Sequence, residues 1–207
     1  MVVIKYKKNK EGIFFSPEET KKILDRLLSI CGVDVKLKNN KKKIYFCSPS
    51  EVGIESKCEY VFIDSIDSAD SVEDKLLNIL PEWLEVEYIY DIEDTVNFEE
   101  VKTSALYEID FDSIKDYCND VVKFFEKYDD FLVEYNLDSC EVEEEKIEVI
   151  TSAGDNGNKV IKLIKDILSF LEISDAYYKI FKRELYVNTG VNKIKDFDKL
   201  IAEIQED

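Results

Sequence analysis

The chain has 207 residues, of which 45% are hydrophobic, and a net charge of −18, so it can form one large or two small domains with a buried core. It contains no histidine, which excludes Ser-His-Asp and Cys-His catalysis within this chain. The five cysteines include no Cys-x-x-Cys pair, and structural zinc and iron–sulfur sites need clustered thiolates. We therefore expect free thiols, no metal site and no cofactor in this chain.

The apolar runs of the chain are short. None approaches the ~20 apolar residues that span a bilayer. The opening segment, MVVIKYKKNK, lacks the apolar region of a signal peptide. These two features predict a cytoplasmic protein that does not bind a membrane.

The charge is unevenly distributed along the chain. Residues 1–50 hold twelve Lys or Arg and five Asp or Glu, whereas residues 51–150 hold seven and thirty-one. One interpretation is a surface kept soluble by acidic groups. The alternative is a bipolar surface, in which the basic segment contacts a phosphate backbone and the acidic segment attracts a basic partner.

The first half of the chain predicts an alternation of strands and helices. Residues 2–8 are β-branched and aromatic, which is typical of a strand. Ser16, Pro17 and Glu19 have the spacing of a capping box, so a helix begins there, and Gly32 is placed to end it. Two strands follow, over residues 42–48 and 58–66. A helix over 71–83, capped by Ser71, and a strand over 84–92 come next.

The same order recurs in the second half. Strands are predicted over residues 104–111, 131–137, 145–152 and 177–187. Helices are predicted between the first and second of these strands, over 113–128, and between the third and fourth, over 158–171. An acidic turn over 138–145 joins the two middle strands, and 192–206 has the apolar spacing of a helix. The pattern predicts an α+β protein with two tandem ferredoxin-like βαββαβ units, each with its own sheet. We place these units at 1–95 and 103–190, with a C-terminal helix within 191–207.

Turn-forming residues gather in the stretch SPSEVGIESKCEY, which covers residues 48–60. In the ferredoxin-like topology this hairpin lies at the same end of the sheet as the start of the first helix. We therefore expect Ser16 and Glu19 to form one polar cluster with Gly53, Glu55 and Ser56. The alternative is a capped helix beside a tight turn, with no binding role.

The basic loop that precedes the second predicted strand is a further candidate. Its lysines, Lys41, Lys42 and Lys43, either contact phosphate groups or form a solvated loop.

The stretch SPSEVGIESKCEY, followed by an aliphatic strand and LLNILPEWLEV, resembles the radical-SAM-linked protein family, a bacterial domain of unknown function encoded beside or fused to radical SAM proteins. The segments FFSPEETKKILDRLLSICGV and KIFKRELYV are similar to other parts of its pattern. The positions that match are Ser16, Arg26, Val52, Gly53, Ile54, Glu55, Ser56, Glu59, Tyr60 and Arg183. Pro17 and the segment KLKNNKKK stand where the family has histidines, which implies a retained scaffold without histidine-dependent chemistry.

The resemblance implies a non-catalytic accessory protein that acts with a radical SAM enzyme, either by binding the enzyme or by presenting its substrate. The partner would hold the iron–sulfur cluster. Two alternatives remain open. The first is an RNA-binding or RNA-processing protein that uses the basic N-terminal segment. The second is an acidic nucleic-acid mimic that inhibits a basic protein.

Overall fold

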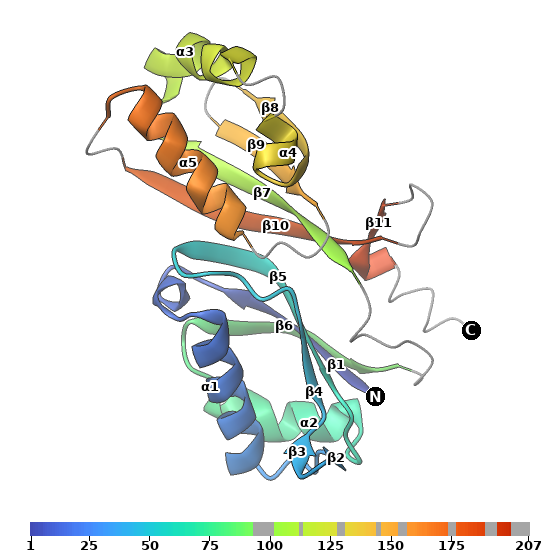
Figure 1. Cartoon of the computed structure of the whole chain (residues 1–207). Helices are drawn as coiled ribbons and strands as arrows, with labels where there is room; N and C mark the ends of the chain where they lie inside the picture. Colours follow the sequence, from blue (N-terminus) through green and yellow to red (C-terminus); the bar gives the residue numbers. More distant parts are fainter. Residues whose placement is uncertain are drawn as a thin grey trace.

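The protein is described by a computed structural model, shown in Figure 1. The structure describes residues 1–92, 102–111, 114–127, 131–143, 146–152, 157–173, 177–188 and 194–199. The elements of the first half are β1 (Val2–Lys8), η1 (Gly12–Phe14), α1 (Pro17–Ile30), β2 (Leu37–Lys38), β3 (Lys41–Lys42), β4 (Ile44–Cys47), β5 (Ile54–Ile63), α2 (Ala69–Leu76), η2 (Leu77–Ile79) and β6 (Leu84–Asp91). Those of the second half are β7 (Thr103–Phe111), α3 (Ile114–Lys127), α4 (Phe131–Glu134), β8 (Leu137–Val142), β9 (Lys146–Thr151), α5 (Asn158–Phe170), β10 (Tyr178–Asn188) and β11 (Ile194–Asp196).

The strands of both halves form one nine-stranded sheet, in the order β6-β1-β5-β10-β7-β9-β8, with β4 paired to β5 and β11 paired to β10. The prediction of a separate sheet for each half is therefore wrong. Pairing within each half is antiparallel, and the halves meet where β5 runs parallel to β10. The fold is mixed α+β with a mostly antiparallel central sheet, as the alternation of elements predicts. A separate two-stranded sheet joins β2 to β3.

Helix α1 begins as the sequence predicts. The hydroxyl of Ser16 accepts a bond from the backbone N–H of Glu19, and the Glu19 carboxylate accepts one from the Ser16 N–H at 2.9 Å, which completes the capping box. Gly32 follows the helix with φ +70°, a conformation that favours glycine. The helix buries Leu24 and Leu28 against the sheet.

Several predicted boundaries differ from the structure. The cap of α2 is Ser68 rather than Ser71, so the helix starts earlier than predicted. Residues 131–134 form α4 instead of a strand, and residues 138–142 of the expected acidic turn belong to β8. Residues 194–196 form β11, where the sequence predicts the C-terminal helix, whereas residues 197–199 are helical as predicted. Much of that predicted helix lies outside the described residues.

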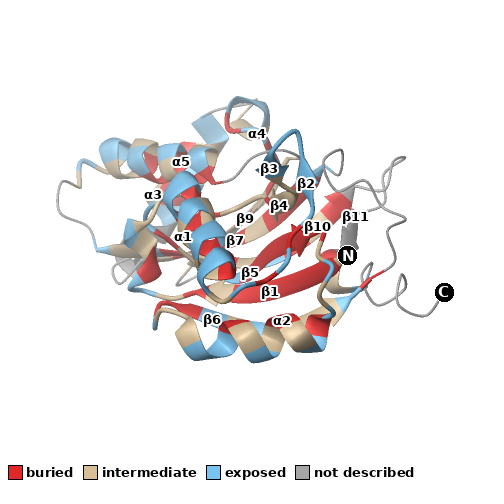
Figure 2. Ribbon diagram, turned by 90° about the horizontal axis from the view of Figure 1, so that it is seen from below, coloured by how far each residue is buried: buried red, intermediate tan, exposed pale blue. Residues whose placement is uncertain are grey.

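Both faces of the sheet are buried in the first half. Val2, Ile4 and Tyr6 pack with α1 and α2 in one core, whereas Val3 points to the opposite face and packs in a core that α3 and α5 complete. Figure 2 shows β1 buried along most of its length. Strand positions that are apolar on both faces are explained by this double coverage.

Candidate functional site

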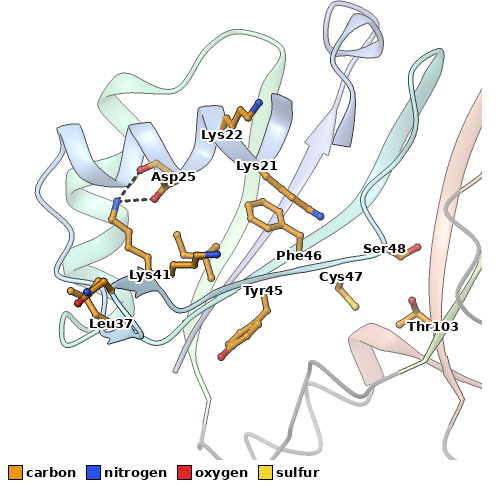
Figure 3. Close-up of a pocket in the computed structure, with 13 residues that line it drawn as sticks. Lys21, Lys22, Asp25, Leu37, Lys41, Tyr45, Phe46, Cys47, Ser48 and Thr103 are labelled. Atoms are coloured by element: carbon orange, nitrogen blue, oxygen red, sulfur yellow. Dashed lines mark hydrogen bonds and ion pairs between the residues drawn. The ribbon is translucent and has the colours of Figure 1, made fainter. Parts of the chain in front are cut away.

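A groove of about 870 Å³ lies beside β4 (Figure 3). Three regions of the first half and one residue of the second form its walls. Helix α1 supplies Lys21, Lys22 and Asp25; the segment containing β2 and β3 supplies Leu37, Asn40, Lys41 and Lys42; β4 and the residue after it supply Ile44, Tyr45, Phe46, Cys47 and Ser48; and β7 supplies Thr103.

The side chains of β4 alternate between the two faces of the sheet. Phe46 points toward α1, and Tyr45 points to the opposite side of the strand (Figure 3). Phe46 accordingly packs against the core beneath α1, and Tyr45 packs against the core of the second half. The groove therefore passes on both sides of one strand and offers an aromatic ring on each.

The groove is strongly basic in an otherwise acidic protein. Four of its lining residues are lysines and one is a carboxylate, Asp25. The Lys42 ammonium donates to the Asp25 carboxylate at 2.8 Å and also to the hydroxyl of Ser29, so it attaches the β2–β3 hairpin to α1. The Lys21 ammonium lies 5.8 Å from the centre of the Phe46 ring. An anionic group fits this electrostatic environment.

The structure separates the three predicted loop lysines. Lys41 is exposed and lines the groove, and Lys42 lines it while paired to α1. Lys43 is not among the lining residues, because its ammonium binds Asp64 at 2.7 Å. Burial alone raises the pKa of Asp64, but hydrogen bonds from Lys36 and Lys43 outweigh it and hold the pKa below its usual value. Lys43 is therefore a structural residue in this arrangement.

The 48–53 loop does approach the start of α1. The Lys8 ammonium donates to the carbonyl of Phe15 at 3.0 Å and to the carbonyl of Ser50 at 3.1 Å. The backbone N–H of Gly53, at φ +90°, donates to the carbonyl of Ile13 at 2.7 Å. The loop is thus tied to the residues just before Ser16.

Glu55 and Ser56 do not lie in this loop. Both belong to β5, and Ser56 is buried, where its hydroxyl accepts a bond from the N–H of Cys58. The prediction of an exposed polar cluster that includes Ser56 is wrong, because the strand begins four residues earlier than its apolar run indicates. Pairing of residues 54–56 with β10 explains the early start.

A buried charged cluster beneath the loop was not predicted from the sequence. Glu59, Lys8 and Lys182 are all almost completely buried. The Lys182 ammonium donates to the carbonyl of Ser48 at 2.6 Å and to the Glu59 carboxylate at 3.4 Å. Ser50 donates its N–H and its hydroxyl to the same carboxylate. Burial lowers the pKa of Lys8, and the Glu59 charge acts in the opposite direction.

The remaining predicted site residues lie apart from the groove lining. Arg183 binds the carboxylate of Glu108, and its guanidinium lies 4.8 Å from the centre of the Phe181 ring. Arg26 is exposed on α1. The resemblance therefore marks positions that the fold places in different regions of the molecule.

A second polar cluster closes over the sheet near residue 198. The Asp198 carboxylate accepts bonds from the hydroxyls of Tyr60 and Tyr88 and from the ammonium of Lys5 at 2.6 Å. The Lys5 ammonium also lies 5.1 Å from the centre of the Tyr88 ring. These contacts join the segment after β11 to three strands of the first half.

The described cysteines are free thiols. Burial raises the pKa of Cys47, Cys58 and Cys140 to about 12, so these groups stay protonated near neutral pH. Nucleophilic attack and metal binding require the thiolate. Within the described part of the chain, no three His, Cys, Asp or Glu residues are grouped so as to hold a metal ion.

The model of a bacterial protein family, described as "Uncharacterized protein conserved in bacteria (DUF2344)", matches residues 2–192. The chain belongs to this family. The match spans both halves of the sheet, so the DUF2344 unit includes the groove and the buried charged cluster. The search among curated proteins found no match for the chain. None of the described helices is long and apolar enough to cross a membrane.

Two solved structures are weakly similar to this DUF2344 protein. The acetolactate synthase small subunit from Thermotoga maritima is 15% identical, with 92% of this chain and 98% of that chain covered and a TM-score of 0.27. A protein assigned as a glycine cleavage system transcriptional repressor is 14% identical, with 87% and 96% covered and a TM-score of 0.29. Likeness at this level carries no argument, so the architecture rests on the strand pairing described above.

Proposed function

We propose that this DUF2344 protein is a non-catalytic accessory protein of the cytoplasm, and that it binds a radical SAM enzyme through the lysine-lined groove beside β4. The observation that supports a binding role is the groove itself, in which four lysines and two aromatic rings surround one strand. The radical SAM partner comes from the resemblance of residues 48–60 to the radical-SAM-linked pattern.

The chemistry of the described residues supports binding over catalysis. The buried thiols are protonated, and the buried lysines Lys8 and Lys182 donate to backbone carbonyls. A lysine nucleophile needs a neutral amine with a free lone pair. These groups therefore hold the loop in place and are poorly suited to attack a substrate.

We further infer that the chain consists of two tandem ferredoxin-like units fused along one sheet edge. The first half has the order β6-β1-β5-β4, and the second has β10-β7-β9-β8. Counted within each half, both orders are fourth, first, third and second strand, with a helix in each of the two connections that cross the sheet. This order belongs to the ferredoxin-like βαββαβ motif.

The test is co-purification with a radical SAM protein encoded beside the gene. The full chain and that enzyme are co-expressed, and the complex is measured by size-exclusion chromatography and calorimetry. We expect a complex that the double variant Lys21→Glu, Lys41→Glu weakens and that the matched variant Lys10→Glu, Lys165→Glu leaves intact. The control lysines are exposed and lie outside the groove lining. Absence of a complex with the unaltered chain would refute the proposal.

A further inference from the structure

The edge of β4 that faces away from β5 is the feature from which the groove's occupant is inferred. Among the described strands, β4 pairs only with β5. The carbonyl of Lys43 accepts a bond from the N–H of Asp64 at 3.1 Å. Because backbone groups alternate sides along an antiparallel strand, those of Tyr45 and Cys47 also face β5. The N–H and C=O groups of Ile44 and Phe46 consequently face the groove.

An edge of this kind accepts another strand. Proteins usually protect such edges by making them short, by placing charges on them or by covering them. Here the edge spans four residues, about 13 Å at ~3.3 Å per residue. Residues from α1 and β7 stand on either side of it, so an extended chain seated there would be enclosed by side chains rather than lie on an open surface.

From this edge and its charges, we propose that the groove binds an extended acidic peptide segment, which adds to β4 as a further strand. This inference rests on the proposed function, because it names the kind of partner segment that the groove takes. Side chains of the added strand would alternate between the Phe46 side and the Tyr45 side. Lys21 and Lys22 come from α1, on the Phe46 side, and Lys41 comes from β3; these lysines would bind carboxylates of the segment.

A peptide fits the observations better than a nucleic acid does. A phosphodiester backbone has no N–H groups to pair with the carbonyls of the strand edge. The net charge of −18 also repels a long polyanion once it extends beyond the groove. A short acidic peptide places fewer charges beyond the groove, so this repulsion is smaller, and it uses both the lysines and the backbone edge.

The experiment uses the full chain and a labelled probe peptide with the sequence Glu-Val-Glu-Thr-Glu-Val-Glu, blocked at both ends. Its binding is followed by fluorescence anisotropy at two salt concentrations. The amide nitrogens of the probe are then methylated one at a time. Because only alternate amides of an added strand face its neighbour, methylation is expected to abolish binding at every second position and to be tolerated between. This scan needs no change to the protein.

The protein variants supply the second measurement. The change Lys21→Glu, Lys41→Glu is expected to weaken probe binding by about tenfold or more, equivalent to ~1.4 kcal/mol. The control variant Lys10→Glu, Lys165→Glu changes the net charge of the protein by the same amount and is expected to weaken binding much less. Circular dichroism and thermal unfolding of both variants establish that the fold is unchanged.

Four results would overturn the inference. A methylation scan without period two excludes strand addition. Binding of a decameric single-stranded RNA, but not of the peptide, with the same lysine dependence assigns the groove to nucleic acid. Lysine-dependent self-association assigns it to a second copy of the chain. Aggregation of the lysine variant, with no binding of either probe to the unaltered chain, shows that the lysines only protect the edge.

The two proposals fail separately. If the radical SAM enzyme forms a groove-dependent complex but the peptide does not bind, the strand-addition inference is wrong and the accessory role stands. If the peptide binds and methylation of every second amide abolishes its binding, but no radical SAM enzyme forms a complex, the proposed partner is wrong and strand addition to β4 stands.

Discussion

Neutralising Glu59 should strongly destabilise this protein. Its carboxylate is buried with the ammonium groups of Lys8 and Lys182 nearby, and it accepts bonds from Ser50 and Lys182. The change Glu59→Gln keeps the shape and removes the charge. Two buried cations then remain without the anion that compensates them.

The size of the effect follows from this burial. Removing one partner of a buried ion pair typically costs about 3–5 kcal/mol, because the other charge stays desolvated. Urea lowers the free energy of unfolding by about 1–3 kcal/mol per molar, with larger proteins toward the upper value. The unfolding midpoint, followed by circular dichroism, should therefore fall by about 1–2 M.

Two further variants decide whether the buried charge is the cause. Adding Lys182→Met to Glu59→Gln removes one stranded cation, so the double variant should be more stable than the single one. The matched change Glu143→Gln alters an exposed carboxylate 3.4 Å from Lys146 and should leave the midpoint unchanged. A Glu59→Gln midpoint close to that of the unaltered chain, or a double variant weaker than the single one, would refute the reasoning.

Three other predictions concern pH, backbone and thiols. The pKa of Asp64 is lowered in the folded state, so its stabilisation is complete above about pH 4 and is lost as pH falls through the lowered value; urea midpoints from pH 7 to 3 should fall less steeply in Asp64→Asn. Gly157→Ala should lower the free energy of unfolding by ~1–3 kcal/mol more than a surface change does, and by more than Gly32→Ala does. The reason is that a Cβ added at Gly157 meets a β5 side chain at 2.5 Å, whereas one added at Gly32 meets nothing within 4 Å. Equal losses of stability in the two variants would contradict this. Cys47 and Cys58 should resist Ellman's reagent at pH 8 in the folded protein, since burial raises their pKa to about 12, and unfolding without reductant should release five thiols per chain; fewer would indicate a disulfide.

Features that depend on neighbouring residues could be predicted from the sequence. The capping box of α1 is contained in four residues, and Gly32 ends that helix through its own backbone conformation. The order of strands and helices follows from apolar spacing in the same way. The prediction failed at residues 131–134, which are apolar enough for a strand. They form a helical turn instead, which the bond from the Tyr135 N–H to the Phe131 carbonyl closes.

Features that depend on distant residues were not predictable in this way. Lys182 and Glu59 are 123 positions apart, and each lies in a strand where a charged residue normally indicates a solvent-facing position. The pairing of β5 with β10, which extends β5 and buries Ser56, depends on both halves being folded. In the groove, the loop lysines Lys41 and Lys42 were predicted as a binding candidate. Lys21 was missed because only the packing of α1 beside β4 brings it there. Tyr45 and Phe46 lie in β4 itself and were assigned only to a strand.

The junction between the halves has a mechanical consequence for the groove. β5 and β10 are joined by three residue pairs, whereas β7 and β10 are joined along almost their full lengths. Along the strand order from β6 to β8, backbone pairing is therefore shortest at the line where the two halves meet. Thr103 lies on one side of that line, and the α1 residues of the groove lie on the other. Bending of the sheet at this line would change the width of the groove, so the contacts of Lys182 with Ser48 and Glu59, which cross the junction, limit how far its walls can separate.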